Sequence, residues 1–180
     1  MQSSAGARRL LGTLDRFMDL RIVTIAEEHI EGFRSVLDSV AKERRYLAFL
    51  EAPSLEESRG FVRRNIKKGY PQCVALVDGN VVGWCDILPI DRPTMAHGGV
   101  LGVGVLQDHR GKGIGTALIR TAIDMAKAAG LTRIELTVRE QNARAIALYD
   151  RLGFIREGLK HRAVRVDGRY EDLICMAFVM

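Results

Sequence analysis

Residues 103–115 read VGVLQDHRGKGIG, in which a short apolar run gives way to a basic, glycine-rich loop. The flanking patterns predict a strand over Gly99–Val105 and a helix over Ile114–Ala129. Glycines at positions 111, 113 and 115 let successive backbone N–H groups turn to one side without clashes from Cβ atoms. The helix start adds unpaired N–H donors and the positive end of its dipole, and Arg110 and Lys112 add full charges. The segment therefore predicts a binding site for a pyrophosphate group.

Two common phosphate-binding motifs do not match this loop. A Walker loop requires glycine where Leu106 stands, and serine or threonine where Gly113 stands. The dinucleotide fingerprint G-x-G-x-x-G requires a third glycine after a pair of glycines. After Gly102 and Gly104 that position is Gln107, and after Gly111 and Gly113 it is Thr116. Both motifs are therefore excluded.

Helical and strand patterns alternate on either side of this segment. Ser54 and Glu57 form a capping box before a helix that Gly69 ends, and the turn 78–80 (Asp-Gly-Asn) marks a β-hairpin. The predicted order is β-α-α-β-β-β-α-β-α-β-β, an α/β layout with a mixed sheet. Strands are predicted at 20–24, 72–77, 81–88, 99–105, 133–138, 154–166 and 170–178, and helices at 27–43, between 54 and 69, at 114–129 and at 142–152.

The composition is that of one ordinary globular domain. The 180 residues are 47% hydrophobic, and no apolar run approaches the ~18 residues that span a bilayer. We expect residues 1–17 to be an N-terminal extension, 18–180 to be the domain, and the protein to be cytoplasmic, because the early apolar run is too short for a secretory signal. No CxxC motif is present and the four histidines are scattered, so no metal site is expected. The net charge of +5 suits either nucleic acid or a polyanionic cofactor.

Two motifs in series resemble those of a known family. The first is Arg-x-x-Gly-x-Gly at Arg110, Gly113 and Gly115. The second, N-x-x-A-x-x-x-Y followed by G-F, runs from Asn142 to Tyr149 and continues at 153–154. Together they resemble the two cofactor motifs of the GNAT superfamily of N-acetyltransferases. The resemblance covers residues 20–180, is strongest over 99–156, and points to the bacterial branch that acetylates amino acids and other small molecules.

The resemblance implies a fold and a co-substrate. It implies a single-domain α/β fold with a central, mixed and mostly antiparallel sheet of about seven strands, helices on both faces, and one splayed pair of parallel strands. Acetyl-CoA would lie in that gap as the co-substrate, with its pantetheine arm along the first of the two strands and its pyrophosphate on the loop. The residues implied for acetyl-CoA are Val103, Val105, Arg110, Gly111, Lys112, Gly113, Ile114, Gly115 and Asn142.

The resemblance also implies a catalytic acid, whereas the base stays open. Tyr149 lies two helical turns after Asn142 and would protonate the departing thiolate, although the same position suits a core residue. Some relatives place a carboxylate where Thr137 stands, so that role cannot be transferred. Glu135 and Asp86 are the two candidates for the base; Glu135 could instead pair with Arg133, and Asp86 could be a solvated surface charge.

The acceptor is the least determined part of the prediction. The resemblance places Arg92, His97 and Arg162 around the acceptor, where an arginine could hold a carboxylate by a two-pronged contact. We expect a free amino acid or a similar small amine, with a protein N-terminus as the alternative acceptor. A non-catalytic acyl-CoA sensor would not need Tyr149. Nucleic acid is not an expected partner, because no aromatic residues accompany the basic loop. No membrane partner is expected. A homodimer that forms through the terminal strands is compatible with the family.

Overall fold

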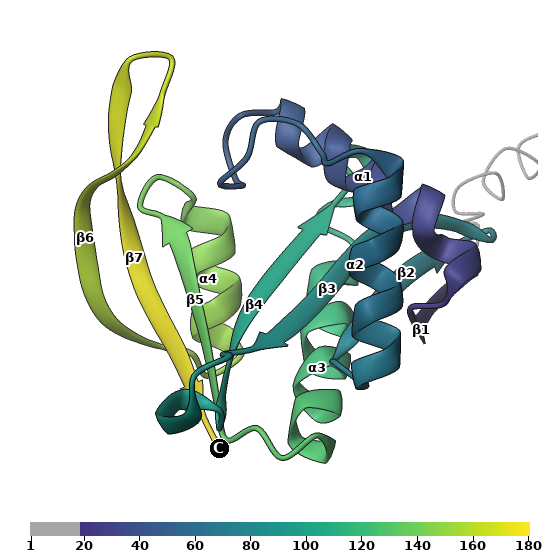
Figure 1. Ribbon diagram of the computed structural model, residues 1–180. Helices are drawn as coiled ribbons and strands as arrows, with labels where there is room; N and C mark the ends of the chain where they lie inside the picture. The colour runs from purple at the N-terminus through teal and green to yellow at the C-terminus, as the bar shows by residue number, and fades with distance from the viewer. Residues whose placement is uncertain (1–18) are drawn as a thin grey trace, which may run out of the picture.

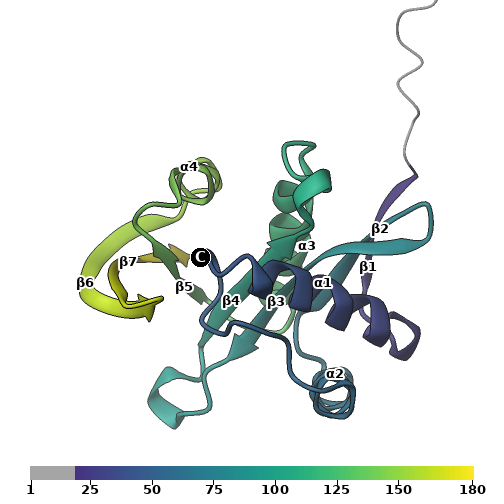
Figure 2. The same cartoon turned by 90° about the horizontal axis from the view of Figure 1, so that it is seen from above.

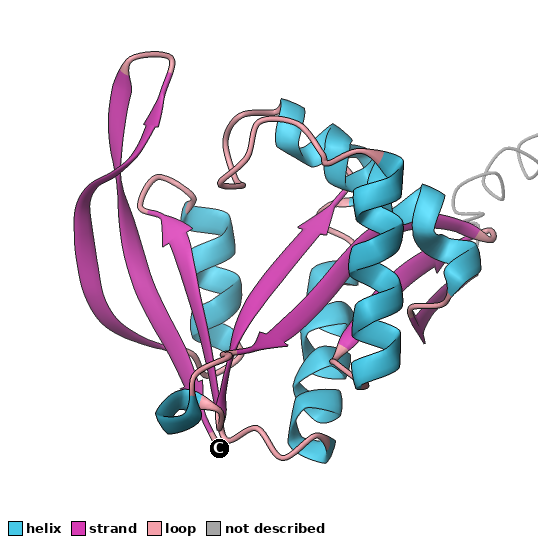
Figure 3. Cartoon of the chain, viewed as in Figure 1, coloured by secondary structure: helices cyan, strands magenta, loops and turns pink. Residues whose placement is uncertain are grey.

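The computed structural model describes residues 19–180, so the predicted extension over residues 1–17 lies outside the described part of the chain. The described elements follow the predicted order, with short 3-10 helices between some of them (Figures 1 and 3). The strands are β1 (Leu20–Thr24), β2 (Gln72–Val77), β3 (Asn80–Pro89), β4 (Gly98–Val105), β5 (Arg133–Arg139), β6 (Ile155–Val166) and β7 (Arg169–Val179). The helices are α1 (Ile30–Lys42), α2 (Leu55–Lys68), α3 (Ile114–Ala128) and α4 (Ala143–Arg151).

Local sequence signals set several element boundaries. The N–H of Glu57 donates to Ser54 Oγ (3.2 Å), and the N–H of Ser54 donates to Glu57 Oε2 (2.9 Å), which completes the predicted capping box of α2. Gly69 ends the helix with a left-handed φ of +65°. Asp78 and Gly79 both have positive φ, so the β2–β3 hairpin turns on two residues, as Asp-Gly pairs favour.

The strands form one seven-stranded sheet with the order β1-β2-β3-β4-β5-β7-β6. Helices α1 and α2 cover one face, and α3 and α4 cover the other (Figure 2). We call these the α1/α2 face and the α3/α4 face. Each face has its own hydrophobic core: Phe33 and Trp84 are buried in the first, and Leu118 and Ile134 in the second. The final hairpin folds back so that β7, rather than β6, pairs with β5.

Among the strands of residues 19–180, β4 and β5 are the only parallel neighbours, and they separate soon after they meet. Their pairing covers three steps, from Gly98 opposite Arg133 to Val100 opposite Glu135. Beyond that point the two strands diverge, as Figure 1 shows, while each continues to its own end. The predicted α/β fold with a splayed parallel pair is therefore confirmed. Among residues 19–180, no helix has the length and apolar character needed to cross a membrane.

Candidate active site

The gap between β4 and β5 exposes an unpaired strand edge. The N–H of Leu106 donates to the carbonyl of Val82 in β3 (2.9 Å), so in this antiparallel ladder the even-numbered residues of β4 bond to β3. The backbone groups of Val103 and Val105 therefore face β5, where the pairing has already ended at Val100. An extended chain that carries amides can bind such an edge as an added strand would.

The glycine-rich loop lies at the open end of this gap and leads into α3. Gly111 and Gly113 each have a φ of +81°, a conformation that side chains other than glycine rarely adopt. Gly113 is the N-cap of α3, and no side chain caps the helix there. The first N–H groups of α3 are therefore available to an anion, next to the positive end of the helix dipole. The loop fits a pyrophosphate group through its backbone.

The side chain of Arg110, which was predicted to contact the pyrophosphate, has three partners within the protein. Its Nε donates to the carbonyl of Val105 (2.8 Å), and its guanidinium forms a two-pronged ion pair with Glu43 at the end of α1. It also lies over the ring of Tyr46, 4.9 Å from the ring centroid. Arg110 thus ties the loop to the opposite face of the sheet, whereas Lys112 is exposed.

A second arginine, Arg144, lies over the loop, and neither sequence motif indicated it. The Nη2 atom of Arg144 is 2.8 Å from the position that a Cβ on Gly111 would occupy. Arg144 is in the first turn of α4, so its charge comes to the loop from a different element. The only signal in the sequence was a cation inside the second motif, at a position that the motif leaves variable.

Helix α4 presents Asn142 and Tyr149, the two residues predicted from the second motif. Asn142 Oδ1 accepts a hydrogen bond from the N–H of Ala145 (3.2 Å), so its carbonyl end caps α4 and its NH2 end is left for a ligand. Tyr149 is 7% exposed and packs against Phe154, with ring centroids 5.7 Å apart. Burial raises the pKa of the Tyr149 phenol well above its ordinary value, so the hydroxyl keeps its proton at neutral pH.

Asp86 is a buried carboxyl group on the α1/α2 face of β3, beside the gap. It is 8% exposed and stands opposite Gly102 of β4. A Cβ on Gly102 would lie 3.1 Å from Asp86 Oδ1, so the glycine leaves the room that the carboxyl group occupies. Burial raises the pKa of Asp86 to about 7, while the Trp84 side chain opposes the rise. A carboxyl group that titrates near neutral pH is suited to accept a proton.

Glu135, the other candidate base, belongs to an ion cluster on β5 and β6. Arg133 Nε donates to Glu135 Oε1 (2.8 Å), and Arg133 Nη1 donates to Glu157 Oε1 (2.9 Å). Glu135 therefore forms the ion pair with Arg133 that was the alternative to a role as the base. Both carboxylates therefore already hold a cation.

A cavity of about 210 Å³ opens beside this cluster. It lies on the α1/α2 face, because Glu135 and Thr137 point away from the core that holds their neighbours Ile134 and Leu136. Val100, where the parallel pairing ends, lines it and is 48% exposed. The cavity therefore adjoins the point from which the gap opens. Its lining residues are Val100, Glu135, Leu136, Thr137, Glu157, Lys160, Cys175 and Met176.

The three residues predicted for the acceptor lie on two separate segments and do not line this cavity. Arg92 and His97 are exposed in the β3–β4 connection. Arg162 is on β6 with a φ of +51°, and its guanidinium stacks 4.0 Å above the ring of Tyr170. The cavity is lined instead by residues of β4, β5, β6 and β7, a combination that the local sequence did not reveal.

The α1–α2 loop, residues 43–54, extends toward the upper ends of β4 and β5 (Figure 1). Arg139, at the end of β5, is 5% exposed and donates to the carbonyls of Arg44 (3.0 Å) and Leu47 (3.1 Å). It also pairs with Glu171 of β7 (3.1 Å), and Arg44 pairs with Asp167 in the β6–β7 turn (2.6 Å). Arg139 is therefore a positioning residue for this loop, and no motif in the sequence indicated it.

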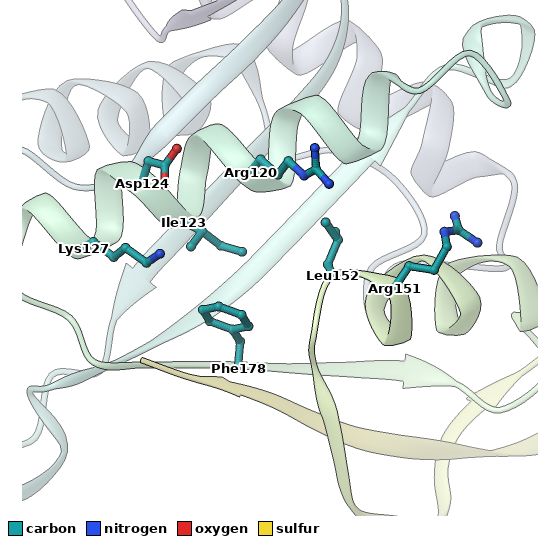
Figure 4. Close-up of a pocket in the computed structure, with 7 residues that line it drawn as sticks. All are labelled: Arg120, Ile123, Asp124, Lys127, Arg151, Leu152 and Phe178. Carbon is teal, nitrogen blue, oxygen red and sulfur yellow. The ribbon is translucent and has the colours of Figure 1, made fainter.

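A second hollow, of about 260 Å³, lies between α3 and α4 on the opposite face. Figure 4 shows Ile123, Leu152 and Phe178 around its apolar part, with Arg120 on α3 and Arg151 at the end of α4. Its residues come from the middle and end of α3 and the end of α4, away from the glycine-rich loop. Across residues 19–180, no three His, Cys, Asp or Glu side chains gather as a metal ion would require.

Comparisons with known proteins agree with this geometry. The model of the acetyltransferase (GNAT) family matches residues 34–154. The L-amino acid N-acetyltransferase AaaT of Escherichia coli is 30% identical over 158 residues, which cover 87% of this chain and 98% of that protein. The N-alpha-acetyltransferase RimI of Mycobacterium tuberculosis is 38% identical over 90 residues, 50% of this chain and 55% of that protein. The structure of yncA from Salmonella typhimurium, solved with its cofactor acetyl-CoA, has a TM-score of 0.85 at 20% identity and covers 89% of this chain and 94% of that one.

Proposed function

Because the chain belongs to the acetyltransferase (GNAT) family, we propose that it transfers the acetyl group of acetyl-CoA to the primary amine of a free amino acid or a similar small amine. The observation that carries the proposal is the unpaired edge of β4, which leads directly to the uncapped start of α3. A strand edge suits the amides of a pantetheine arm, and a helix start suits a pyrophosphate. The likeness to AaaT over nearly its whole length supports an amino-acid acceptor.

Most of the contacts that we assign to acetyl-CoA come from backbone groups rather than from side chains. We assign Val103 and the N–H of Val105 to the pantetheine amides, because the carbonyl of Val105 already accepts a hydrogen bond from Arg110 Nε. We assign the N–H groups of residues 111–115 to the pyrophosphate. The guanidinium of Arg110 already pairs with Glu43, so we assign the side-chain charge near the phosphates to Lys112 and Arg144 instead. Asn142 would use its NH2 group on the pantetheine arm.

Three groups divide the chemistry between them. Asp86 accepts the proton that the acceptor amine must lose, since its pKa of about 7 is matched to that task and Glu135 is held by Arg133. A backbone N–H on the free edge of β4 stabilises the negative charge that develops on the carbonyl oxygen when the C–N bond forms. Tyr149 donates its proton to the thiolate that departs when the C–S bond breaks.

Thiol release from acetyl-CoA, measured with free amino acids, polyamines and N-terminal peptides, tests this proposal, and calorimetric titration measures acetyl-CoA binding separately. We expect turnover on amino acids. Tyr149→Phe should lower kcat by about a hundredfold or more without changing the Kd for acetyl-CoA, because it removes only the proton donor. Tyr70→Phe, on the loop after α2, is the matched control and should match the wild type.

Each alternative has its own outcome. Turnover confined to peptides would replace the amino-acid acceptor with a protein N-terminus, to which the partial likeness to RimI points. Binding of acetyl-CoA without turnover on any amine would indicate a non-catalytic sensor. No binding at all would overturn the proposal. The cytoplasmic location and the homodimer stay predictions.

A further inference from the structure

We propose that Lys160 forms a binding site for the carboxylate of the acceptor and so makes the enzyme selective for amino acids over amines that lack this group. The inference rests on the proposed function, because it concerns the acceptor of that same reaction. Lys160 lines the cavity of about 210 Å³ beside the gap. It stands opposite Leu173 on β7, which in turn stands opposite Arg139 on β5.

Among the described cations of β5 and β6, Lys160 is the one that has neither a carboxylate nor an aromatic ring as a partner. Arg133 holds Glu135 and Glu157. Arg139 holds Glu171 and two backbone carbonyls, and His161 pairs with Asp172 (2.8 Å). Arg162 stacks on Tyr170. Within residues 19–180, Lys160 has no carboxylate within ion-pairing distance, although it stands next to the cavity that contains two of them.

Lys160 neutralises the net negative charge that the cavity would otherwise have. Glu135, Glu157 and Lys160 line the cavity, and Arg133 pairs with both carboxylates without lining it, so the four formal charges sum to zero. Without Lys160 the sum would be −1, and a carboxylate would meet net repulsion there. With Lys160 the acceptor's carboxylate gains a charge-assisted hydrogen bond.

The rest of the cavity suits the remainder of an aliphatic amino acid. Val100 and Cys175 supply apolar surface, and Thr137 supplies a hydroxyl. Val100 is the last residue of β4 that pairs with β5, so an acceptor with its carboxylate on Lys160 reaches back toward the start of the gap. The reacting amine would then lie between this cavity and Asp86, which faces Gly102 two residues further along β4.

The test compares amino acids with their decarboxylated counterparts, for instance L-leucine with 3-methylbutylamine and L-phenylalanine with 2-phenylethylamine, in the thiol-release assay. The wild type should prefer the amino acid. Lys160→Gln should raise the KM for the amino acid about tenfold or more, the usual worth of a hydrogen bond to a charged group, and leave the KM for the amine unchanged or lower. Lys160→Glu should extend the same trend, and Lys67→Gln, an exposed lysine on α2, is the matched control.

The outcomes separate this inference from the proposed function. A wild type that acetylates both classes of acceptor with equal KM, or a Lys160→Gln protein that keeps the preference, overturns the carboxylate site and leaves the transferase intact. Equal losses of turnover on both classes in Lys160→Gln also overturn it, because they indicate general damage to the site. A wild type that acetylates no amine overturns both proposals.

Discussion

Replacing Asp86 by asparagine should make the protein more stable at alkaline pH and much less active. Burial raises the pKa of Asp86 from its ordinary value of 3.8 to about 7. In the unfolded chain the group loses its proton near pH 3.8, whereas in the folded protein it keeps the proton until about pH 7. Stability from this group is therefore fully present below pH 3.8 and is lost as the pH rises toward 7. Asparagine has the same shape and does not ionise.

The size of the effect follows from the rise in pKa. At 1.36 kcal/mol per unit of pKa, the rise amounts to about 4 kcal/mol of stability lost at pH 8. Between pH 5 and pH 8 the difference in the free energy of unfolding between Asp86→Asn and the wild type should change by about 3 kcal/mol in favour of the variant. Comparing the two proteins at the same two pH values cancels the contributions of all groups that titrate alike in both.

Urea unfolding at pH 5, 6, 7 and 8 measures this difference, with Asp91→Asn, an exposed residue after β3, as the control. The Asp91→Asn difference should stay flat over this range. The activity of Asp86→Asn should fall by about a hundredfold, the usual worth of a positioned base. If the stability difference between Asp86→Asn and the wild type were the same at pH 5 and pH 8, Asp86 would not be the buried titrating group described, and its role as the base would lose its support.

Two further substitutions test the packing around the site. In Gly104→Ala the new Cβ would lie 2.3 Å from Trp84, and this overpacking should lower the free energy of unfolding by about 2 kcal/mol. Gly158→Ala, in which the new Cβ meets no atom within 4 Å, is the control and should change the free energy of unfolding little. Equal urea midpoints for the two variants would contradict the contact with Trp84. Arg139→Met leaves Glu171 and two backbone carbonyls without their donor and should lower the free energy of unfolding by about 2 kcal/mol. It should also increase the KM for the acceptor by more than it changes the KM for acetyl-CoA. Unchanged stability and an unchanged KM for the acceptor would show that the α1–α2 loop does not depend on Arg139.

Local sequence determined the parts of this protein that depend on neighbouring residues. The glycines at 111 and 113 adopt the left-handed backbone that the loop requires, and the capping box at Ser54 and the Asp78-Gly79 turn form as predicted. Such features arise from backbone conformation and contacts within a few residues, so a sequence carries them directly. The order of elements followed from hydrophobic patterns in the sequence, whereas the splayed parallel pair was predicted from the resemblance to the family.

Tertiary structure decided the features that depend on residues far apart in the chain. Asp86 and Glu135 were equal candidates in the sequence, and only the fold buries the first against Gly102 and pairs the second with Arg133. Arg110 forms an ion pair with Glu43, a residue 67 positions earlier, so its charge is compensated by the end of α1. The cavity at Lys160 exists because β7 lies between β5 and β6. Burial and ion pairing set the charge of a side chain, and both are properties of contacts that form only when distant segments pack together.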